Sequence, residues 1–231
     1  HAIYLAKDLA VQCSNEGERM ESLAKLEAAA PLLKLISSLV FDSAFLCEVI
    51  DEMLPPSFLY TVFLACQSSS IDHEKMQRMR EEIFRSMALL VGVAQTDRSR
   101  AIIRDGMTSR SLHGRNIGPL DLFKIAISSR SSEALRLVTT IVAGLLPGAR
   151  QEWFSQASFG LDGIQREIKA GTFGQDNKGP TEALVHLTHT MVLQVNTVFF
   201  AKDFKDSAVL AGLRALARAV TAVSSVLKLS T

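Results

Sequence analysis

One pattern, apolar residues spaced three and four positions apart, constrains the fold of this sequence more than any other feature. It is clearest in the stretch from Ser207 to Leu227, whose apolar positions are Val209, Leu210, Leu213, Leu216, Ala217, Val220, Val223 and Leu227. This spacing places them on one face of an α-helix, with Arg214 and Arg218 on the opposite face. The same period recurs along most of the chain, and no convincing strand pattern interrupts it. We therefore predict an all-α fold of roughly eleven antiparallel helices joined by short turns.

The composition supports a well-packed interior. Hydrophobic residues make up 48% of the 231 positions, which is enough to bury a core without disulfide bonds. We expect a single all-helical domain over residues 1–231, or a fragment of a larger protein, since the chain enters a helical pattern at His1. Two segments are possible subdivisions: the Ser-rich linker near residues 67–71 and the unpatterned loop at 107–118.

The segment from Ser131 to Ile168 contains the best local helix pair. An aliphatic helix is followed by a turn at Pro147-Gly148, and then by a helix with a single apolar stripe that includes Trp153. This pair resembles the helical units of armadillo and HEAT repeats. The resemblance implies an α-solenoid segment, in which stacked helix pairs present an extended binding surface. A globular multi-helix bundle remains the alternative, because no repeat-to-repeat identity is visible.

Cysteine usage and hydropathy suggest a compartment. Cys13, Cys47 and Cys66 form no CxxC pair and have mostly apolar neighbours, which predicts buried thiols and a reducing compartment, the cytoplasm or the nucleus. The longest apolar stretch, residues 184–200, contains His186, His189, Gln194 and Asn196. This polar content favours a buried helix over a membrane span.

No catalytic, nucleotide or cofactor motif is recognisable, and we expect neither an enzyme nor a bound cofactor. Glu182, His186 and His189 share one face of a predicted helix, where they could form a polar seam or a metal site. Glu48, Asp51 and Glu52 are also spaced for one helix face. This spacing is typical of a hydrated surface, and a catalytic or metal cluster is the alternative reading.

Charge is unevenly distributed along the sequence. The stretch up to Glu52 holds nine acidic and four basic residues, whereas 72–136 holds eight acidic and twelve basic residues. The densest basic run supplies the predicted partner-binding residues: Arg98, Arg100, Arg104, Arg110, Arg115, Lys124 and Arg130. Guanidinium groups bind carboxylates well, so an acidic peptide or a neighbouring segment of the same scaffold is the expected partner. Nucleic acid is not expected, because Phe123 is the only aromatic residue between Arg85 and Arg136.

Together these features favour a non-catalytic scaffold or adaptor segment, which binds other proteins in transport, trafficking or assembly. Two alternatives stay open at this point. One is an all-helical RNA-binding module of the nucleoprotein type, which would use the basic middle region. The other is a helical enzyme or lipid carrier with an internal pocket.

Overall fold

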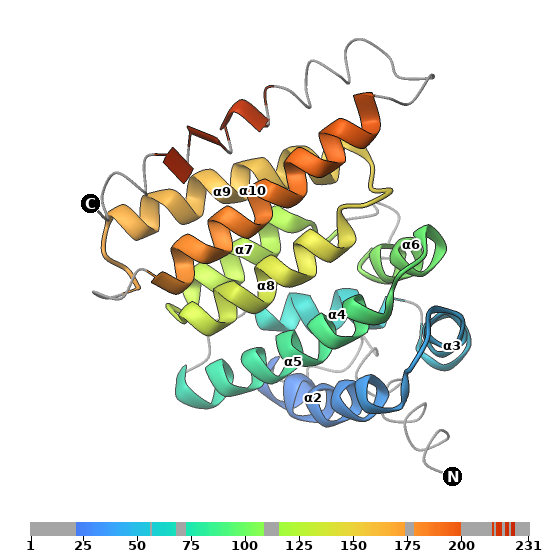
Figure 1. Cartoon of the computed structure of the whole chain (residues 1–231). Helices are drawn as coiled ribbons and strands as arrows, with labels where there is room; N and C mark the ends of the chain where they lie inside the picture. Colours follow the sequence, from blue (N-terminus) through green and yellow to red (C-terminus); the bar gives the residue numbers. More distant parts are fainter. Residues whose placement is uncertain are drawn as a thin grey trace. The chain divides into compact units, whose positions relative to one another are not determined.

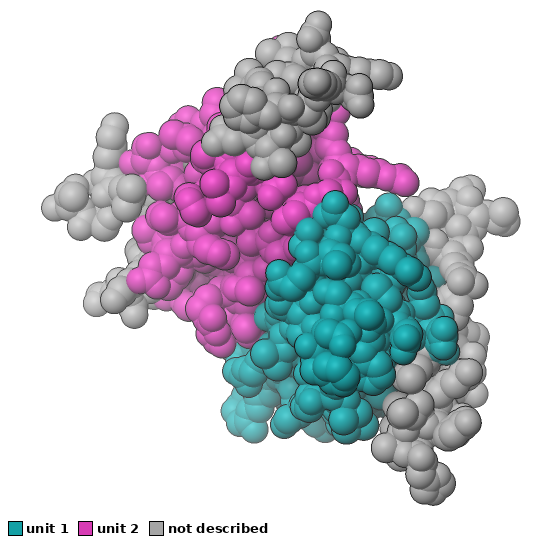
Figure 2. Space-filling model, turned by 45° about the vertical axis from the view of Figure 1, so that its right-hand side comes forward, with its two compact units in different colours: residues 1–117 teal, residues 118–231 magenta. Residues whose placement is uncertain are grey.

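The computed structural model describes residues 22–55, 57–67, 73–108, 116–173 and 178–199, together with isolated positions between 214 and 224. Within these ranges the chain forms nine α-helices and one π-helical turn (Figure 1). No strand occurs among the described residues, where Thr108 and Asn116 form an isolated bridge. The chain divides into two compact units, residues 1–117 (unit 1) and 118–231 (unit 2), which are coloured separately in Figure 2. None of the described helices has both the length and the apolar character needed to cross a membrane.

Unit 1 is built around a long helix pair. Its elements are α2 (Ser22–Leu39), α3 (Ser43–Glu48), the π-helical turn η1 (Val49–Met53), α4 (Phe58–Cys66), α5 (His73–Val93) and α6 (Asp97–Gly106). α2 lies along α5 (Figure 1), while α6 contacts α3, η1 and α4. Glu27 pairs with Lys75 and, further along both helices, Lys34 lies 3.5 Å from Glu82. These ion pairs show that α2 and α5 run parallel.

Proline is common in the first turn of a helix, so Pro31 predicts that one helix ends near Ala30 and that another begins at Pro31. The structure shows that this prediction is wrong. α2 continues through Pro31 without a break. The proline is exposed, so the carbonyl that loses its N–H partner lies on the hydrated side of the helix. The apolar residues on both sides of Pro31 lie against α5 and α4 and stabilise the helix through packing, which outweighs the local cost of proline.

The core of unit 1 contains large aromatic and aliphatic side chains. Phe63 of α4 stacks on Phe84 of α5, with ring centroids 6.3 Å apart. Cys47 and Cys66 are buried free thiols, as predicted, whereas Cys13 lies outside the described residues. Burial raises the pKa of Cys66 to about 12, although the charge of Arg80 acts in the opposite direction. Cys66 therefore behaves as a small apolar side chain at neutral pH.

Unit 2 consists of two layers of helices. Its elements are α7 (Pro119–Ser128), α8 (Ser132–Leu145), α9 (Gln151–Lys169) and α10 (Lys178–Phe199). The most extensive contacts join helices that are next but one in sequence: α7 packs on α9, and α8 packs on α10. Consecutive helices also touch, α7 with α8 and α9 with α10. Each consecutive pair therefore acts as a hairpin, and the second hairpin stacks on the first.

Short local signals set the helix boundaries of unit 2. The Gly118 N–H donates to the Asp121 carboxylate over 3.3 Å at the start of α7. Ser131 caps α8 by accepting a hydrogen bond from the Ala134 N–H over 3.1 Å. Between these helices Arg130 adopts a positive φ of 51°, which reverses the chain in a short turn.

The contact between α7 and α9 depends on a glycine. A Cβ atom at Gly160 would lie only 2.1 Å from Cδ2 of Phe123, so the phenyl ring occupies the space of the missing side chain. Trp153 lies in the same helix and is only 8% exposed, which confirms its predicted place in the core. The neighbouring aromatic residue Phe154 is partly exposed.

The described positions of the last stretch differ from the predicted helix face. Val220, predicted to point inward, is 47% exposed. Arg218, predicted to face solvent, contacts α9 instead: its guanidinium lies 4.3 Å from the Phe159 ring centroid and 3.4 Å from the Asp162 carboxylate. Its long side chain can cover an apolar ring while its charged end keeps polar partners, which hydropathy alone does not anticipate.

Candidate functional site

Two adjoining hollows on unit 1 form a groove between η1 and α6, which we call the η1–α6 groove. The broad section has a volume of about 380 Å³ and is lined by Ile50, Asp51, Leu54, Pro55, Ser57, Phe58, Leu59, Ile102, Asp105, Gly106 and Thr108. The narrow section has a volume of about 310 Å³ and is lined by Ser43, Ala44, Cys47, Glu48, Asp51, Glu52, Thr96 and Arg98. Asp51 belongs to both linings, so the two sections meet at this residue.

The first wall of the groove is α3 with its π-helical extension. Asp42 starts α3 by accepting a hydrogen bond from the Phe45 N–H over 2.8 Å, as its sequence position predicts. The helix then widens, and the Leu54 N–H donates to the Val49 carbonyl five residues earlier over 3.1 Å. Single π-helical turns often occur at functional sites, because the extra residue changes where neighbouring side chains point. Here the turn leaves Asp51 exposed, between the buried residues Ile50 and Leu54.

The end of the broad section is held by Ser57. This residue has a left-handed conformation, with φ 63° and ψ 16°, at the start of α4. A non-glycine residue pays about 1 kcal/mol for this conformation. The Ser57 hydroxyl does not cap α4 but donates to the Thr108 carbonyl over 2.9 Å, which offsets the cost. This hydrogen bond joins the start of α4 to the segment that follows α6.

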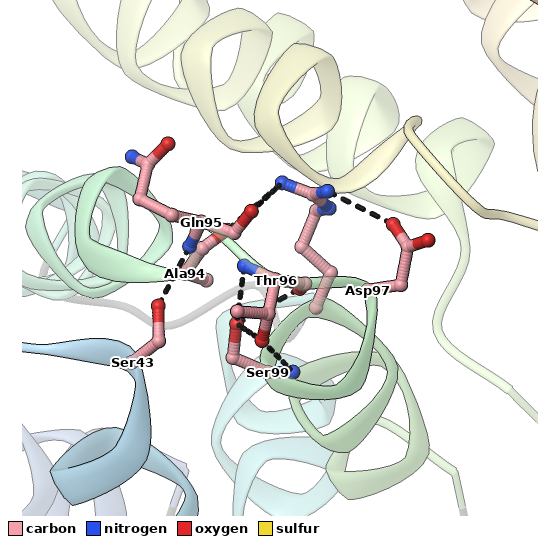
Figure 3. Close-up of polar contacts among 7 residues, drawn as sticks. Ser43, Ala94, Gln95, Thr96, Asp97 and Ser99 are labelled. Atoms are coloured by element: carbon pink, nitrogen blue, oxygen red, sulfur yellow. Dashed lines mark hydrogen bonds and ion pairs between the residues drawn. The ribbon is translucent and has the colours of Figure 1, made fainter.

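The second wall, α6, is fixed by the polar junction shown in Figure 3. The Ser43 hydroxyl accepts from the Gln95 N–H over 2.9 Å and donates to the Val93 carbonyl over 2.7 Å. Thr96 and Ser99 bond reciprocally, each side chain to the other's N–H over 3.1 Å, in a capping box at the start of α6. The junction therefore ties the first residue of α3 to the segment that leads into α6.

Arg100 completes this junction. Its guanidinium donates to the carbonyls of Ala94 and Gln95, both over 3.1 Å, and lies 2.9 Å from the Asp97 carboxylate (Figure 3). Its side chain is only 16% exposed. A guanidinium held by these three groups has a structural role, because it satisfies carbonyl groups at the end of α5.

The groove combines an apolar floor with an acidic rim. The floor consists of buried Ile50, Leu54, Phe58 and Leu59 together with partly exposed Ile102. The charged side chains that line the groove are Glu48, Asp51, Glu52, Asp105 and Arg98, and all of them are exposed. Four carboxylates against one guanidinium give the groove a negative potential. Such a surface suits a ligand that carries positive charge next to an apolar group.

The predicted basic surface is spread over both units. Arg98 is exposed and lines the narrow section of the groove, while Arg104 is half-buried, and burial lowers the pKa of its guanidinium. Lys124 and Arg130 are exposed on unit 2. Arg110 and Arg115 lie outside the described residues. A common binding surface for these side chains therefore stays a prediction.

The predicted histidine face lies on α10 of unit 2. Glu182, His186 and His189 are all exposed, so they do not form a buried polar seam. In the part of the chain that the structure describes, no group of three or more His, Cys, Asp or Glu side chains is arranged to hold a metal ion.

Sequence reasoning found only part of the groove. Glu48, Asp51 and Glu52 are recognisable in the sequence as acids on one helix face, within the acidic first part of the chain. Ile102 and Asp105 of α6 were missed, because they meet η1 only through tertiary contacts. A weak signal was present at Gly106, where a Cβ atom would lie 3.3 Å from the Leu59 side chain. A glycine at the end of an amphipathic helix is, however, more often a sign of helix termination.

Comparison with protein-family models, with curated proteins and with solved structures gives no match for this chain. Its function must therefore be inferred from the geometry of the chain itself.

Proposed function

We propose that this chain is a non-catalytic, protein-binding segment of a helical-repeat scaffold, and that it holds a partner segment in the η1–α6 groove. The observation that carries the proposal is the groove's lining: an open, partly apolar trough with exposed carboxylates on both walls. A peptide can contact such a surface through both its backbone and its side chains. Apolar contact supplies affinity, and the charges favour particular partners.

The scaffold part of the proposal is supported by the packing of unit 2. Contacts between helices that are next but one in sequence are what stacked helix pairs produce, as in armadillo and HEAT repeats. A globular bundle of four helices would also bury the same apolar faces. The preference for a repeat architecture rests on the α7–α9 and α8–α10 contacts together with the repeat-like pair between Ser131 and Ile168.

The alternatives gain no specific support. Four carboxylates in the groove would repel nucleic-acid phosphates, so the groove does not favour the RNA-binding hypothesis. The groove is open on one side, whereas a lipid carrier needs an enclosed apolar cavity.

Selection of displayed peptides on the intact chain tests this proposal. The variant Ile102→Trp places an indole ring in the broad section, and Leu89→Trp places the same ring on an exposed position of α5 outside the groove. We expect selected peptides to bind the wild type and Leu89→Trp equally and to bind Ile102→Trp at least about tenfold more weakly. They should also slow hydrogen exchange in residues 49–59 and 97–108.

Circular dichroism must first show that both variants keep the helical content of the wild type. The proposal is wrong if no peptide is enriched, or if the enriched peptides bind all three proteins equally and leave hydrogen exchange in the groove unchanged.

A further inference from the structure

The acidic side chains that the structure describes in unit 1 differ in whether they have a basic partner. Outside the groove, four of them form ion pairs with basic residues: Glu27 with Lys75, Glu74 with Arg78, Glu82 with Lys34, and Asp97 with Arg100. In the groove, Glu48, Asp51 and Glu52 form no ion pair with any residue that the structure describes, although Arg98 lines the same section. Among the described residues, three carboxylates without a basic partner thus lie together on one wall of the groove.

This arrangement costs stability. Like charges at helical spacings of three and four residues repel one another. Asp105 adds a further carboxylate from α6 on the other wall of the broad section. A cation bound between the walls would relieve this repulsion, and among the residues that the structure describes Arg98 is the one basic side chain in the lining.

The apolar floor begins where the acidic cluster ends. Asp51 belongs to the lining of both sections, whereas Ile50 of η1 and Leu54, the residue that follows η1, belong to the floor of the broad section only. A ligand that spans the two sections therefore meets carboxylates first and aliphatic side chains next. An isolated cation would contact only the carboxylates, and an uncharged apolar group would contact only the apolar floor.

We propose that the partner is a basic peptide segment, an inference that rests on the proposed function. It places a Lys or Arg side chain against the carboxylates of η1, in the narrow section. It places a neighbouring bulky aliphatic side chain on the apolar floor of the broad section. Charge complementarity identifies the partner class, because within the described part of unit 1 these carboxylates have no basic partner, whereas Glu27, Glu74, Glu82 and Asp97 each have one.

Fluorescence polarisation with three synthetic peptides of equal length tests the inference. The first peptide contains Lys and Leu, the second contains Glu and Leu, and the third contains Lys and Ser. The test variant is Asp51→Asn/Glu52→Gln. The control variant, Glu74→Gln/Glu182→Gln, removes the same charge from exposed positions outside the groove. Both variants change the net charge equally, so a general electrostatic attraction would respond to both in the same way.

We expect the Lys–Leu peptide to bind most tightly, and the Asp51→Asn/Glu52→Gln variant to weaken its binding about tenfold. The control variant should change its dissociation constant by less than about twofold, the range of a screened, distant charge. Raising the salt concentration should weaken binding to the wild type more than binding to the test variant.

The possible failures are distinguishable. If the Glu–Leu peptide binds as tightly as the Lys–Leu peptide, and Ile102→Trp abolishes both interactions, the groove binds peptides but the inference about charge is wrong. The inference is also wrong if the Lys–Ser peptide binds as well as Lys–Leu, or if both double variants weaken binding equally. If Ile102→Trp changes the binding of no peptide, both the inference and the proposed function are wrong.

Discussion

Unit 1 and unit 2 use the same helical pattern to build different surfaces. In unit 2, α8, α9 and α10 have 14, 19 and 22 residues. α8 packs on α10, and α9 packs on α7. In unit 1, the long helices α2 and α5 are accompanied by α3, η1, α4 and α6, which have 6, 5, 9 and 10 residues. Short segments that meet near their ends cannot interlock along a whole face. The groove lies where they meet, at the π-helical turn and the left-handed Ser57.

The comparison shows that one helical sequence pattern can produce both closely packed helices, as in unit 2, and helices that leave a groove between them, as in unit 1. Phe123 fills the space above Gly160 in unit 2, so the two helices leave no room at that contact. Asp51 in unit 1 lies in the π-helical turn beside buried residues and is exposed to solvent.

The largest expected effects come from removing one core ring in each unit. Phe84→Ala in unit 1 and Phe123→Ala in unit 2 each delete a fully buried phenyl ring, which costs about 3–5 kcal/mol of unfolding free energy. Hydrogen exchange followed by mass spectrometry should show faster exchange in the unit that carries the substitution. Equal acceleration in both units by either variant would contradict the division into separately packed units.

The next effect concerns the tight contact in unit 2. Gly160→Ala should destabilise the protein by about 1–3 kcal/mol, because the new methyl group overlaps the Phe123 ring. The matched control is Gly163→Ala in the same helix, whose methyl group would lie 3.6 Å from Ile127 Cδ1 and should be tolerated. Thermal unfolding monitored by circular dichroism measures both. A Phe123→Leu background should reduce the cost of Gly160→Ala, and an unchanged cost would show that the ring is not responsible.

A smaller effect is expected in unit 1, whose stability should fall at alkaline pH because of Cys66. Cys66 has a pKa of about 12 in the folded state against an ordinary value of 9.0, so the folded protein retains a proton that the unfolded chain releases. The stabilising contribution is complete below pH 9 and is lost as the pH rises towards 12. At about pH 10 the loss amounts to about 1 kcal/mol.

Urea unfolding at about pH 8 and about pH 10 measures this loss, and Cys66→Ala is the control because it lacks the thiol. The unfolding free energy of the wild type should fall further than that of Cys66→Ala. Parallel pH dependences of the two proteins would show that the thiol is not held in its neutral form.

The smallest effect tests how α6 is held as the second wall of the groove. Ser43→Ala removes the hydroxyl that bonds to Val93 and Gln95 and should cost about 1 kcal/mol. Hydrogen exchange in residues 97–106 should quicken. Ser128→Ala in unit 2 also removes a hydroxyl that donates to a carbonyl, but within one helix, and should cost less than about 0.5 kcal/mol. Equal costs would show that the junction does not stabilise the wall.

Local signals predicted helix starts well where the interaction spans only a few residues. The sequence offers Asp42, then Thr96 or Asp97, then Ser131 or Ser132 as helix caps, and the structure uses Asp42, Thr96 and Ser131. Ser57, which the sequence also predicts as a cap, does not cap α4. A capping side chain reaches an N–H three residues ahead, so sequence neighbours decide the outcome. Pro31 shows the limit of such rules, because burial of the residues around it decides whether α2 continues.

The groove could be predicted only in part. The acidic face of Glu48, Asp51 and Glu52 is a local property of the sequence. Whether these carboxylates form ion pairs depends on whether another element of the fold places a basic side chain beside them. Arg98 and Arg100 were both predicted to bind a partner, yet the guanidinium of Arg100 instead donates to the Ala94 and Gln95 carbonyls just after α5. Sequence proximity does not show which of two arginines has carbonyl groups within reach.

The sequence by itself determined that this protein is helical, because apolar spacing and capping residues act within a few turns of one chain. It also determined the excess of acidic residues in its first part. The tertiary structure alone decided which helices became partners, since packing compares surfaces that lie far apart in sequence. It likewise decided that the acids of η1 should face α6 across an apolar floor, because a groove exists only between elements that have already come together.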